Sequence, residues 1–225
     1  MPRRQQDVSQ QRLFPALTVP ANTIVAGVDE VGRGALWGPV VAAAVILPDT
    51  ALAPLTARGV TDSKQLSASQ RQELIQWIYQ LAVDCRIGYA SVREIDRLNI
   101  LQASLLAMKR AVNRLQVVPE LCLIDGNQRI PALELPQQTV VKGDQVSLAI
   151  AAASIVAKVW RDKLVTRFSS RYPAYELATN KGYGTVKHRR AIATYGITPY
   201  HRKSFAPCQT KSCQELVGFS ADGKD

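Results

Sequence analysis

The chain has 225 residues, of which 47% are hydrophobic and 20% charged, so it is long and apolar enough to form one large domain with a sizeable core. Its 28 lysines and arginines outnumber 18 acidic residues, and the formal charge of +10 favours a polyanionic partner such as nucleic acid, although an anionic membrane surface would also attract it. No apolar run approaches the roughly 20 residues of a membrane span, and residues 1–14 lack the apolar centre of a signal peptide. We therefore expect a cytoplasmic protein with no membrane partner.

The chain begins with a segment rich in Gln, Arg and Pro, residues 1–22, which is expected to be a flexible arm. Two β-branched runs follow, at residues 24–28 and 39–47, and predict buried strands with a turn at residues 29–38 between them. Asp29 and Glu30 open this turn. Adjacent carboxylates at the mouth of a buried strand are costly unless a cation or hydrogen bonds compensate them. The pair therefore indicates a cation site, with a plain polar hairpin loop as the alternative.

The middle of the chain is predicted to alternate helices and strands. Residues 49–59 contain Pro and Ala and are expected to be a loop. Residues 67–70 match a capping box that begins a helix with an apolar stripe from Leu74 to Leu81. Residues 83–92 alternate enough for a third strand, and apolar residues at three- and four-residue steps over 93–115 predict one long helix.

Two further short strands are predicted to lead to aspartates. Residues 120–124 precede Asp125, and residues 139–141 precede Asp144. An Ala-rich helix then follows, whose small residues suit close packing on a sheet. Asp162 in that helix lies about five turns beyond Asp144 and is expected to form a surface ion pair.

Strand ends in α/β sheets gather ligands, so Asp29, Glu30, Asp125 and Asp144 are expected to converge if the strands lie side by side. Four carboxylates around one point repel each other, and Mg²⁺ or Mn²⁺, which prefer hard oxygen ligands, would relieve that repulsion. A carboxylate-bound metal in a basic protein suggests phosphodiester chemistry. Taken singly, Asp125 would also suit a turn before a glycine, and Asp144 the N-cap of the next helix, and neither role excludes metal binding.

Six segments resemble bacterial ribonuclease HII, the type 2 ribonuclease H, in the family's order: GVDEVGRGALWGPVVAAAV, DSKQLS, IDGN, VVKGDQVSLAIAAASIVAKVWRD, KGYGT and YHRKSFAP. The match runs over residues 24–207. It implies an α/β ribonuclease H-like fold, with a mixed five-stranded sheet flanked by helices and a small helical C-terminal region. It also implies hydrolysis of the RNA strand in RNA/DNA hybrids and nicking of duplex DNA 5′ of embedded ribonucleotides, giving 3′-hydroxyl and 5′-phosphate ends.

Carried over position by position, the resemblance makes Asp29, Glu30, Asp125 and Asp144 catalytic carboxylates that hold two Mg²⁺ or Mn²⁺ ions. Neighbouring residues of a strand point to opposite faces, so Asp29 and Glu30 cannot both aim inward from a regular strand. We therefore expect a backbone bend at Glu30, or metal binding through its carbonyl oxygen.

The substrate side of the resemblance covers a turn and a tyrosine. Gly32, Arg33 and Gly34 match the family's ribose-reading turn, in which main-chain groups can approach a 2′-hydroxyl; a mere tight turn is the alternative. Tyr183 matches the tyrosine that stacks on the sugar beyond the RNA–DNA junction, and its flanking glycines suggest an exposed ring.

Phosphate contacts are expected from basic residues that lie mostly in the C-terminal third, with a solvated basic face as the alternative for each. They are Lys64, Lys158, Lys187, Arg189, Arg190, His201, Arg202 and Lys203. Ser154 falls on the same helical face as Lys158 and is assigned to substrate binding with it.

Cysteine spacing argues against a structural zinc site. Cys85 and Cys122 lie in apolar segments, and Cys208 and Cys213 lie in a polar tail. Neither histidine has metal-ligand spacing to a cysteine, so free thiols are expected.

The expected organisation is an arm at residues 1–22, a catalytic core at 23–165, a helical substrate-binding region at 166–210 and a disordered tail at 211–225, in a monomeric protein. Two other functions remain open at this point. A ribonuclease H-like DNA nuclease, of the resolvase or transposase type, would share the acidic centre without the ribose-reading turn. A non-catalytic basic nucleic-acid module would explain the charge and leave the acids at the strand ends without a role.

Overall fold

The computed structural model describes residues 23–61 and 63–209. The expectations for the arm, for the tail and for Cys213 concern residues outside these ranges. The sheet has the order β3-β2-β1-β4-β5. Its strands are β1 (Val25–Val31), β2 (Val40–Ile46), β3 (Asp84–Ala90), β4 (Leu121–Asp125) and β5 (Gln137–Val140). β2 runs antiparallel to β1 and β3. β1, β4 and β5 are parallel, so the carboxyl ends of these three strands lie at the same end of the sheet.

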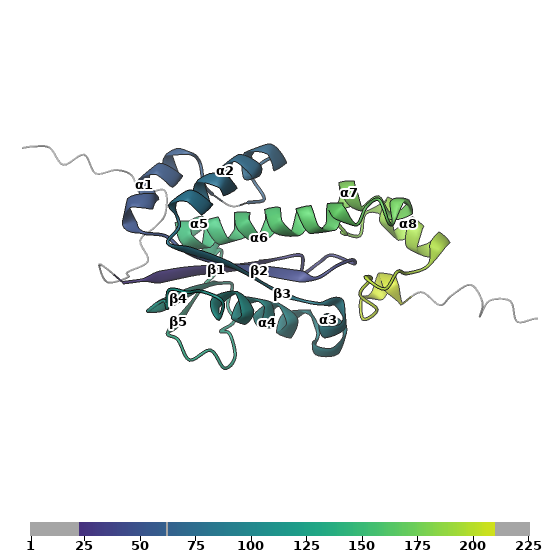
Figure 1. Cartoon of the computed structure of the whole chain (residues 1–225). Coiled ribbons are helices and arrows are strands. Elements are labelled where there is room, and N and C mark those ends of the chain that lie inside the picture. Colours follow the sequence, from purple (N-terminus) through teal and green to yellow (C-terminus); the bar gives the residue numbers. More distant parts are fainter. Residues whose placement is uncertain (1–22, 62, 210–225) are drawn as a thin grey trace, which may run out of the picture.

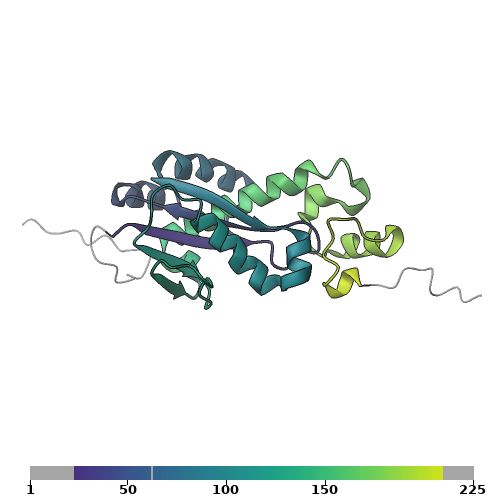
Figure 2. The same ribbon diagram turned by 60° about the horizontal axis from the view of Figure 1, so that its bottom comes forward.

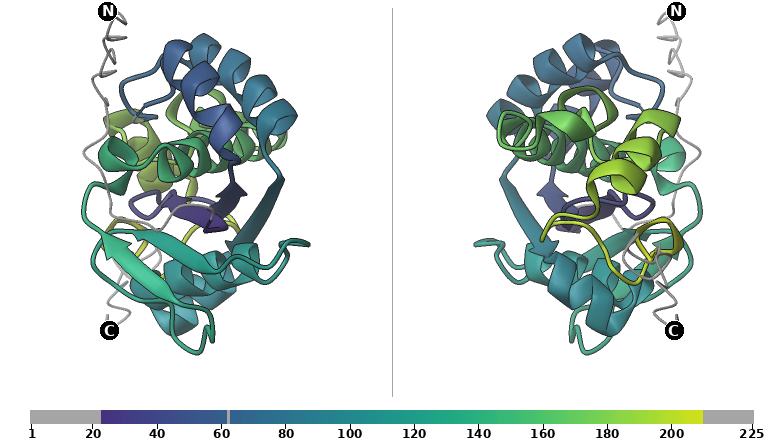
Figure 3. Two further views of the ribbon diagram at one scale, coloured as in Figure 1. Left: turned by 90° about the vertical axis from the view of Figure 1, so that its left-hand side faces the viewer. Right: turned by 90° about the vertical axis from the view of Figure 1, so that its right-hand side faces the viewer.

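Helices cover both faces of this sheet (Figure 1). One face carries α1 (Asp49–Ala57), α2 (Ala68–Leu81), α5 (Gly143–Val146) and α6 (Leu148–Arg167). The other face carries α3 (Val92–Leu98) and α4 (Ile100–Val112), which come forward in Figure 2. Seen from its end, the sheet lies between these two helical layers (Figure 3). The mixed sheet flanked by helices confirms the expected fold class.

The C-terminal region lies beyond the end of the sheet, against the end of α6 (Figure 1). It contains 3-10 turns at Pro173–Tyr175 and Ala206–Cys208 and the helices α7 (Leu177–Asn180) and α8 (Val186–Tyr195). Its apolar core forms around Trp37, with Val165, Leu177, Ile192 and Cys208 buried beside it. Cys208 is therefore part of a packed cluster, and not of the polar tail that its neighbours in the sequence suggested.

Close packing of α6 on β1 fixes the centre of the molecule. A Cβ atom on Gly27 would lie 2.2 Å from the backbone carbon of Ala149, so only glycine lets the helix approach the strand at this point. Alternate residues of β1 face opposite layers, with Ala26 and Val28 in the core beneath α4. The next residue, Asp29, therefore faces α6.

Residues 49–59, expected to be a loop, instead contain α1. Pro54 lies inside this helix, where the missing N–H normally discourages helix formation. Ala51 and Leu55 are fully buried against α2 and α6, and this apolar contact outweighs the cost of the proline.

The prediction of a single helix over residues 93–115 is wrong, because the helix is interrupted at Asn99, between α3 and α4. Asn99 adopts φ 71° and ψ 166°, which lies outside the helical region and is unfavourable for a residue other than glycine, and its side-chain oxygen accepts a hydrogen bond from the Gln102 N–H at the start of α4. The capping box at Ser67 and Gln70 is confirmed, with both reciprocal hydrogen bonds present.

Asp29 and Glu30 lie inside β1, although the sequence placed them in a turn. The strand continues to Val31 in unbroken register with β2, where Asp29 lies opposite Ala43 and Glu30 opposite Ala42. The bend expected at Glu30 is therefore absent. Within the described part of the chain, no helix is both long and apolar enough to cross a membrane.

Candidate active site

Asp29 is the buried centre of the acidic group. The residue is 5% exposed, and the Ser154 hydroxyl on α6 hydrogen bonds to its carboxylate. Because that hydroxyl has one hydrogen, it accepts from the Ser63 hydroxyl, 2.8 Å away. Burial, followed by the charges of Glu30 and Asp125, holds the pKa of Asp29 well above its usual range.

Glu30 is the next residue of β1, near the end of the strand, so its side chain leaves the strand on the face opposite to that of Asp29. Burial raises the pKa of this carboxyl, and the Arg33 guanidinium, 3.2 Å from Glu30 Oε1, opposes that effect. Asp125 also raises the pKa of Glu30, so three carboxylates from β1 and β4 lie within electrostatic reach of each other.

A hydrogen bond from the backbone next to Asp144 links the Asp144 segment to Asp125. Asp125 ends β4, and its Oδ1 accepts a hydrogen bond of 2.7 Å from the N–H of Gly143, the first residue of α5. Asp144 follows directly, is 5% exposed and lies 3.9 Å from Lys64 Nζ. It is not the N-cap of α6, because Ser147 holds that position.

A divalent cation fits this donor set. Within the described ranges, no group of three or more acidic, histidine or cysteine side chains is arranged so that it could hold a metal ion as it stands. The available donors are nonetheless hard carboxylate oxygens from one end of the sheet. Burial, and after it repulsion from neighbouring carboxylates, raises the pKa of Asp29 and Glu30. A bound cation would reverse that repulsion.

Two buried arginines hold the turn at Gly32. Arg202 donates to the carbonyl oxygens of Gly32 and Arg33 at 2.7 Å each, and to that of Gly38 at 3.0 Å. Its guanidinium is fully buried, and burial together with the charge of Arg161 lowers the pKa of Arg202 to about 9. The expected phosphate contact of Arg202 is therefore wrong: this side chain binds the turn from inside the protein. His201 is also fully buried, which argues against the phosphate contact expected of it.

Arg161, which sequence reasoning missed, completes this support. Its three nitrogen atoms donate to the carbonyl oxygens of Pro39, Trp37 and Lys181, at 3.1, 2.9 and 2.9 Å. Burial lowers its pKa. The four-residue step from Ala157 through Arg161 to Val165 places it on the buried stripe of α6, which is the signal that identifies it in the sequence.

The structure brings Tyr183 beside the Gly32–Gly34 turn. Tyr183 pairs with Ala35 in an antiparallel bridge, and the Gly182 carbonyl oxygen accepts hydrogen bonds from the N–H groups of Leu36 and Trp37. The Tyr183 ring is half-buried, not fully exposed as the flanking glycines suggested. Lys158 Nζ lies 5.6 Å from its centroid, within cation–π range.

The remaining basic side chains differ in how they are held. Lys158 pairs with Asp162 at 3.0 Å, which gives Asp162 the expected ion pair in a partly shielded position. Lys187 lies 3.3 Å from Glu176, and Arg189 Nε donates to the Gly184 carbonyl oxygen. The exposed residues Lys64, Lys187, Arg189, Arg190 and Lys203 can all reach a polyanion.

The chain is similar to known proteins over most of its length. The family model described as Ribonuclease HII matches residues 26–208. Ribonuclease HII of Trichodesmium erythraeum (strain IMS101) is 65% identical over 184 residues, which cover 82% of this chain and 87% of that protein. Ribonuclease HII of Acaryochloris marina (strain MBIC 11017) is 64% identical over 189 residues, covering 84% and 96%. The crystal structure of ribonuclease H2 from Pyrococcus horikoshii OT3 has a TM-score of 0.71 at 25% identity, covering 86% of this chain and 99% of that chain.

Proposed function

The chain belongs to the ribonuclease HII family of RNA/DNA-hybrid endonucleases, and we propose that it cleaves both RNA/DNA hybrids and duplex DNA at embedded ribonucleotides. The observation that carries this proposal is the β-bridge between Tyr183 and Ala35, which places Tyr183 beside the Gly32–Gly34 turn. This turn follows directly after β1, the strand that contains Asp29 and Glu30. Catalytic carboxylates and sugar-contacting groups thereby share one end of the sheet. The family assignment decides against a non-catalytic basic module.

Asp29, Glu30, Asp125 and Asp144 would hold two divalent cations, Mg²⁺ or Mn²⁺. When bound, such ions supply Lewis acidity to the attacking water and to the departing 3′-oxygen, which leaves 3′-hydroxyl and 5′-phosphate ends. The chain's own residues orient this group: Ser154 fixes the Asp29 carboxylate, and the Gly143 N–H fixes that of Asp125.

The ribose contact is assigned to main-chain groups of the turn. The Gly32 carbonyl oxygen already accepts from Arg202 and from the Ala35 N–H, which uses both of its lone pairs. The Arg33 carbonyl oxygen, with one lone pair remaining, and the turn's N–H groups are left for a 2′-hydroxyl, which both donates and accepts. Tyr183 would stack on the adjoining sugar.

The C-terminal region, residues 166–210, would bind the duplex through its exposed lysines and arginines, with residues 23–165 as the catalytic core. We place the chain in the cytoplasm, where the DNA of a bacterium lies, and expect a monomer, because one chain supplies every group assigned here.

Replacement of Asp144 by Asn tests the carboxylate assignment. The variant keeps the size of the side chain and removes its charge, so we expect a folded protein that loses Mg²⁺-dependent cleavage by at least about a hundredfold. Asp162→Asn is the matched control, since Asp162 pairs with Lys158 outside the acidic group. Full cleavage by the Asp144 variant would remove this residue from the site.

A further inference from the structure

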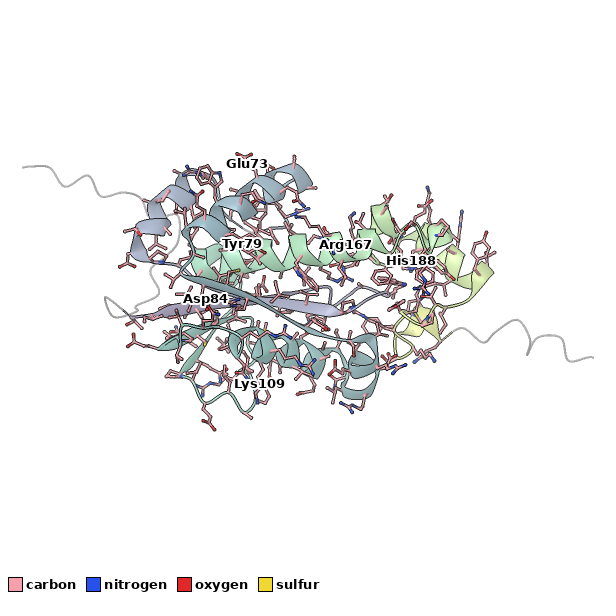
Figure 4. The ribbon with its side chains drawn as sticks, in the orientation of Figure 1. Glu73, Tyr79, Asp84, Lys109, Arg167 and His188 are labelled. Atoms are coloured by element: carbon pink, nitrogen blue, oxygen red, sulfur yellow. The ribbon has the colours of Figure 1, made fainter. Side chains whose placement is uncertain are left out.

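Two histidines occupy the interior of the C-terminal region, away from the acidic group. His188 lies on α8, within the side chains gathered there (Figure 4). His201 lies in the segment between α8 and the 3-10 turn at Ala206–Cys208. Both are fully buried, and their Nε2 atoms are 3.1 Å apart. Burial lowers the pKa of His188, and burial with the charge of His188 lowers the pKa of His201 to about 4. Both imidazoles are therefore neutral near pH 7.

The hydrogen bonds around the pair determine where each proton lies. His188 Nδ1 is 2.9 Å from the Tyr183 carbonyl oxygen, which can only accept, so His188 carries its proton on Nδ1. Its Nε2 then accepts from His201 Nε2. That leaves His201 Nδ1 unprotonated, as it must be to accept the Thr198 N–H at 2.8 Å. The two ends of the chain of hydrogen bonds independently require the same pair of tautomers.

These three hydrogen bonds form a chain, here called the relay, in which every donor points the same way: from the Thr198 N–H to His201, from His201 to His188, and from His188 to the Tyr183 carbonyl oxygen. Each histidine also contacts the ring of Tyr175, at centroid distances of 6.0 and 5.0 Å, which restricts tilting of both imidazoles. Trp37 Nε1 donates to the Thr198 hydroxyl at 3.1 Å and so ties the start of the relay to the segment after the Gly32–Gly34 turn.

We propose that His188 and His201 are positioning residues, which fix the backbone of Tyr183 and thereby set its ring against the ribose-reading turn. The inference rests on the proposed role of Tyr183 in the ribonuclease reaction. Gly182 and Gly184 flank this tyrosine, and glycine provides little steric restraint. Hydrogen bonds must supply the restraint instead: the Tyr183 carbonyl accepts from His188 and from the Thr185 N–H, while the Tyr183 N–H donates to Asn180.

The tautomers can be tested without reference to activity. The chain has two histidines, so the nitrogen NMR spectrum of ¹⁵N-histidine-labelled protein at about pH 8 shows two imidazoles, and His188→Asn identifies one of them. We expect His188 to be protonated on Nδ1 and His201 on Nε2. The same tautomer on both histidines, or the reverse pair, would overturn the relay.

Matched substitutions test its effect on Tyr183. Asn places an amide near the position of Nδ1, so His188→Asn can still donate to the Tyr183 carbonyl. Gln reaches the position of Nε2, so His188→Gln keeps the partner of His201 and loses that donor. Per folded molecule, we expect kcat/KM for nicking at a single ribonucleotide to fall about tenfold in His188→Gln and less than about threefold in His188→Asn. Equal activity of the two variants would overturn the proposal.

A double-variant cycle separates positioning from general stability. His188→Gln should add nothing to the loss caused by Tyr183→Ala, because the relay acts through that side chain; independent, multiplying losses would contradict it. If Tyr183→Ala alone nicks like the native chain, the proposed role of Tyr183 fails, while the NMR result still decides the relay. Should His188→Gln fail to fold, His201→Asn, which loses the donor to His188, and His201→Gln, which keeps it, provide the same comparison.

Discussion

Arg202 Nη2 lies 2.7 Å from the carbonyl oxygen of Gly32, across 170 positions of the sequence. The Gly32–Gly34 turn, to which we assign ribose recognition, is therefore shaped by a buried guanidinium from the C-terminal region. A planar guanidinium can serve several carbonyl oxygens at fixed angles, and an ammonium group cannot reproduce that geometry.

Arg202→Lys should accordingly destabilise the fold and disturb the turn. At least one buried carbonyl oxygen loses its donor, so we expect the free energy of unfolding to fall by about 2–4 kcal/mol in urea titrations, with weaker nicking at single ribonucleotides. Arg189→Lys is the matched control, because Arg189 is exposed and makes one such bond, to Gly184. Equal stability of both variants would show that Arg202 does not hold the turn.

The two glycines of the turn should respond differently to alanine. Gly32 has φ 90°, and a Cβ there would lie 2.2 Å from Arg161 Nε, so Gly32→Ala should cost at least about 2 kcal/mol of stability. A Cβ on Gly34 meets no atom within 4 Å. Gly34→Ala should therefore keep the native melting temperature and lose ribonucleotide nicking, because its methyl group projects into the space assigned to the substrate. Native nicking by a folded Gly34→Ala would separate Gly34 from ribose recognition.

Local sequence patterns predicted those parts of the fold that depend on neighbouring residues. The capping box at Ser67 and the Ala-rich helix α6 are examples, and the parallel order of β1, β4 and β5 explains why acids after separate strands approach each other. The break at Asn99 was missed because apolar spacing continues through it while a single φ angle changes.

Burial of Arg161 and Arg202 depends on contacts that sequence proximity does not reveal. Their carbonyl partners lie mostly in residues 32–39, more than 120 positions earlier in the chain. A positive charge in a basic C-terminal segment therefore resembled a phosphate contact, whereas the folded chain uses it to satisfy backbone oxygens. The roles of the carboxylates, the turn and Tyr183 remain predictions that the experiments above and below test.

His201 should make the fold sensitive to mild acid. Its pKa is about 4 in the folded chain against an ordinary 6.5, so between these values the unfolded chain binds a proton that the folded chain does not. The free energy of unfolding should fall as pH drops through this window, by a total on the order of 3 kcal/mol. Glu94, whose pKa the hydrogen bond from Arg110 lowers to about 2, acts with the same sign only below its ordinary 4.5.

Urea unfolding between about pH 7.5 and pH 4.5 measures this effect. The raised pKa values of Asp29 and Glu30 act with the opposite sign, so the comparison between the native chain and His201→Gln isolates the histidine. The variant should show a flatter dependence on pH over this range. An unchanged slope would mean that His201 is protonated as easily in the folded chain as in the unfolded one.

Asp29→Asn should separate stability from metal binding. In the absence of divalent cations, the neutral amide relieves the repulsion from Glu30 and Asp125, so the melting temperature should equal or exceed that of the native chain. Added Mg²⁺ or Mn²⁺ should raise the melting temperature of the native chain and of Asp162→Asn, and leave Asp29→Asn unchanged. Equal stabilisation of all three proteins would exclude Asp29 as a ligand.

The central claim is that the carboxylates and the ribose-reading turn act together on a ribonucleotide within a duplex. The most direct measurement is a nicking assay on duplex DNA with one embedded ribonucleotide and on the same duplex without it, each with and without Mg²⁺ or Mn²⁺. We expect one nick, 5′ of the ribonucleotide, that requires the metal and leaves 3′-hydroxyl and 5′-phosphate ends. Metal-dependent cleavage of the all-DNA duplex at a similar rate, or cleavage of the ribonucleotide duplex without metal, would contradict the claim.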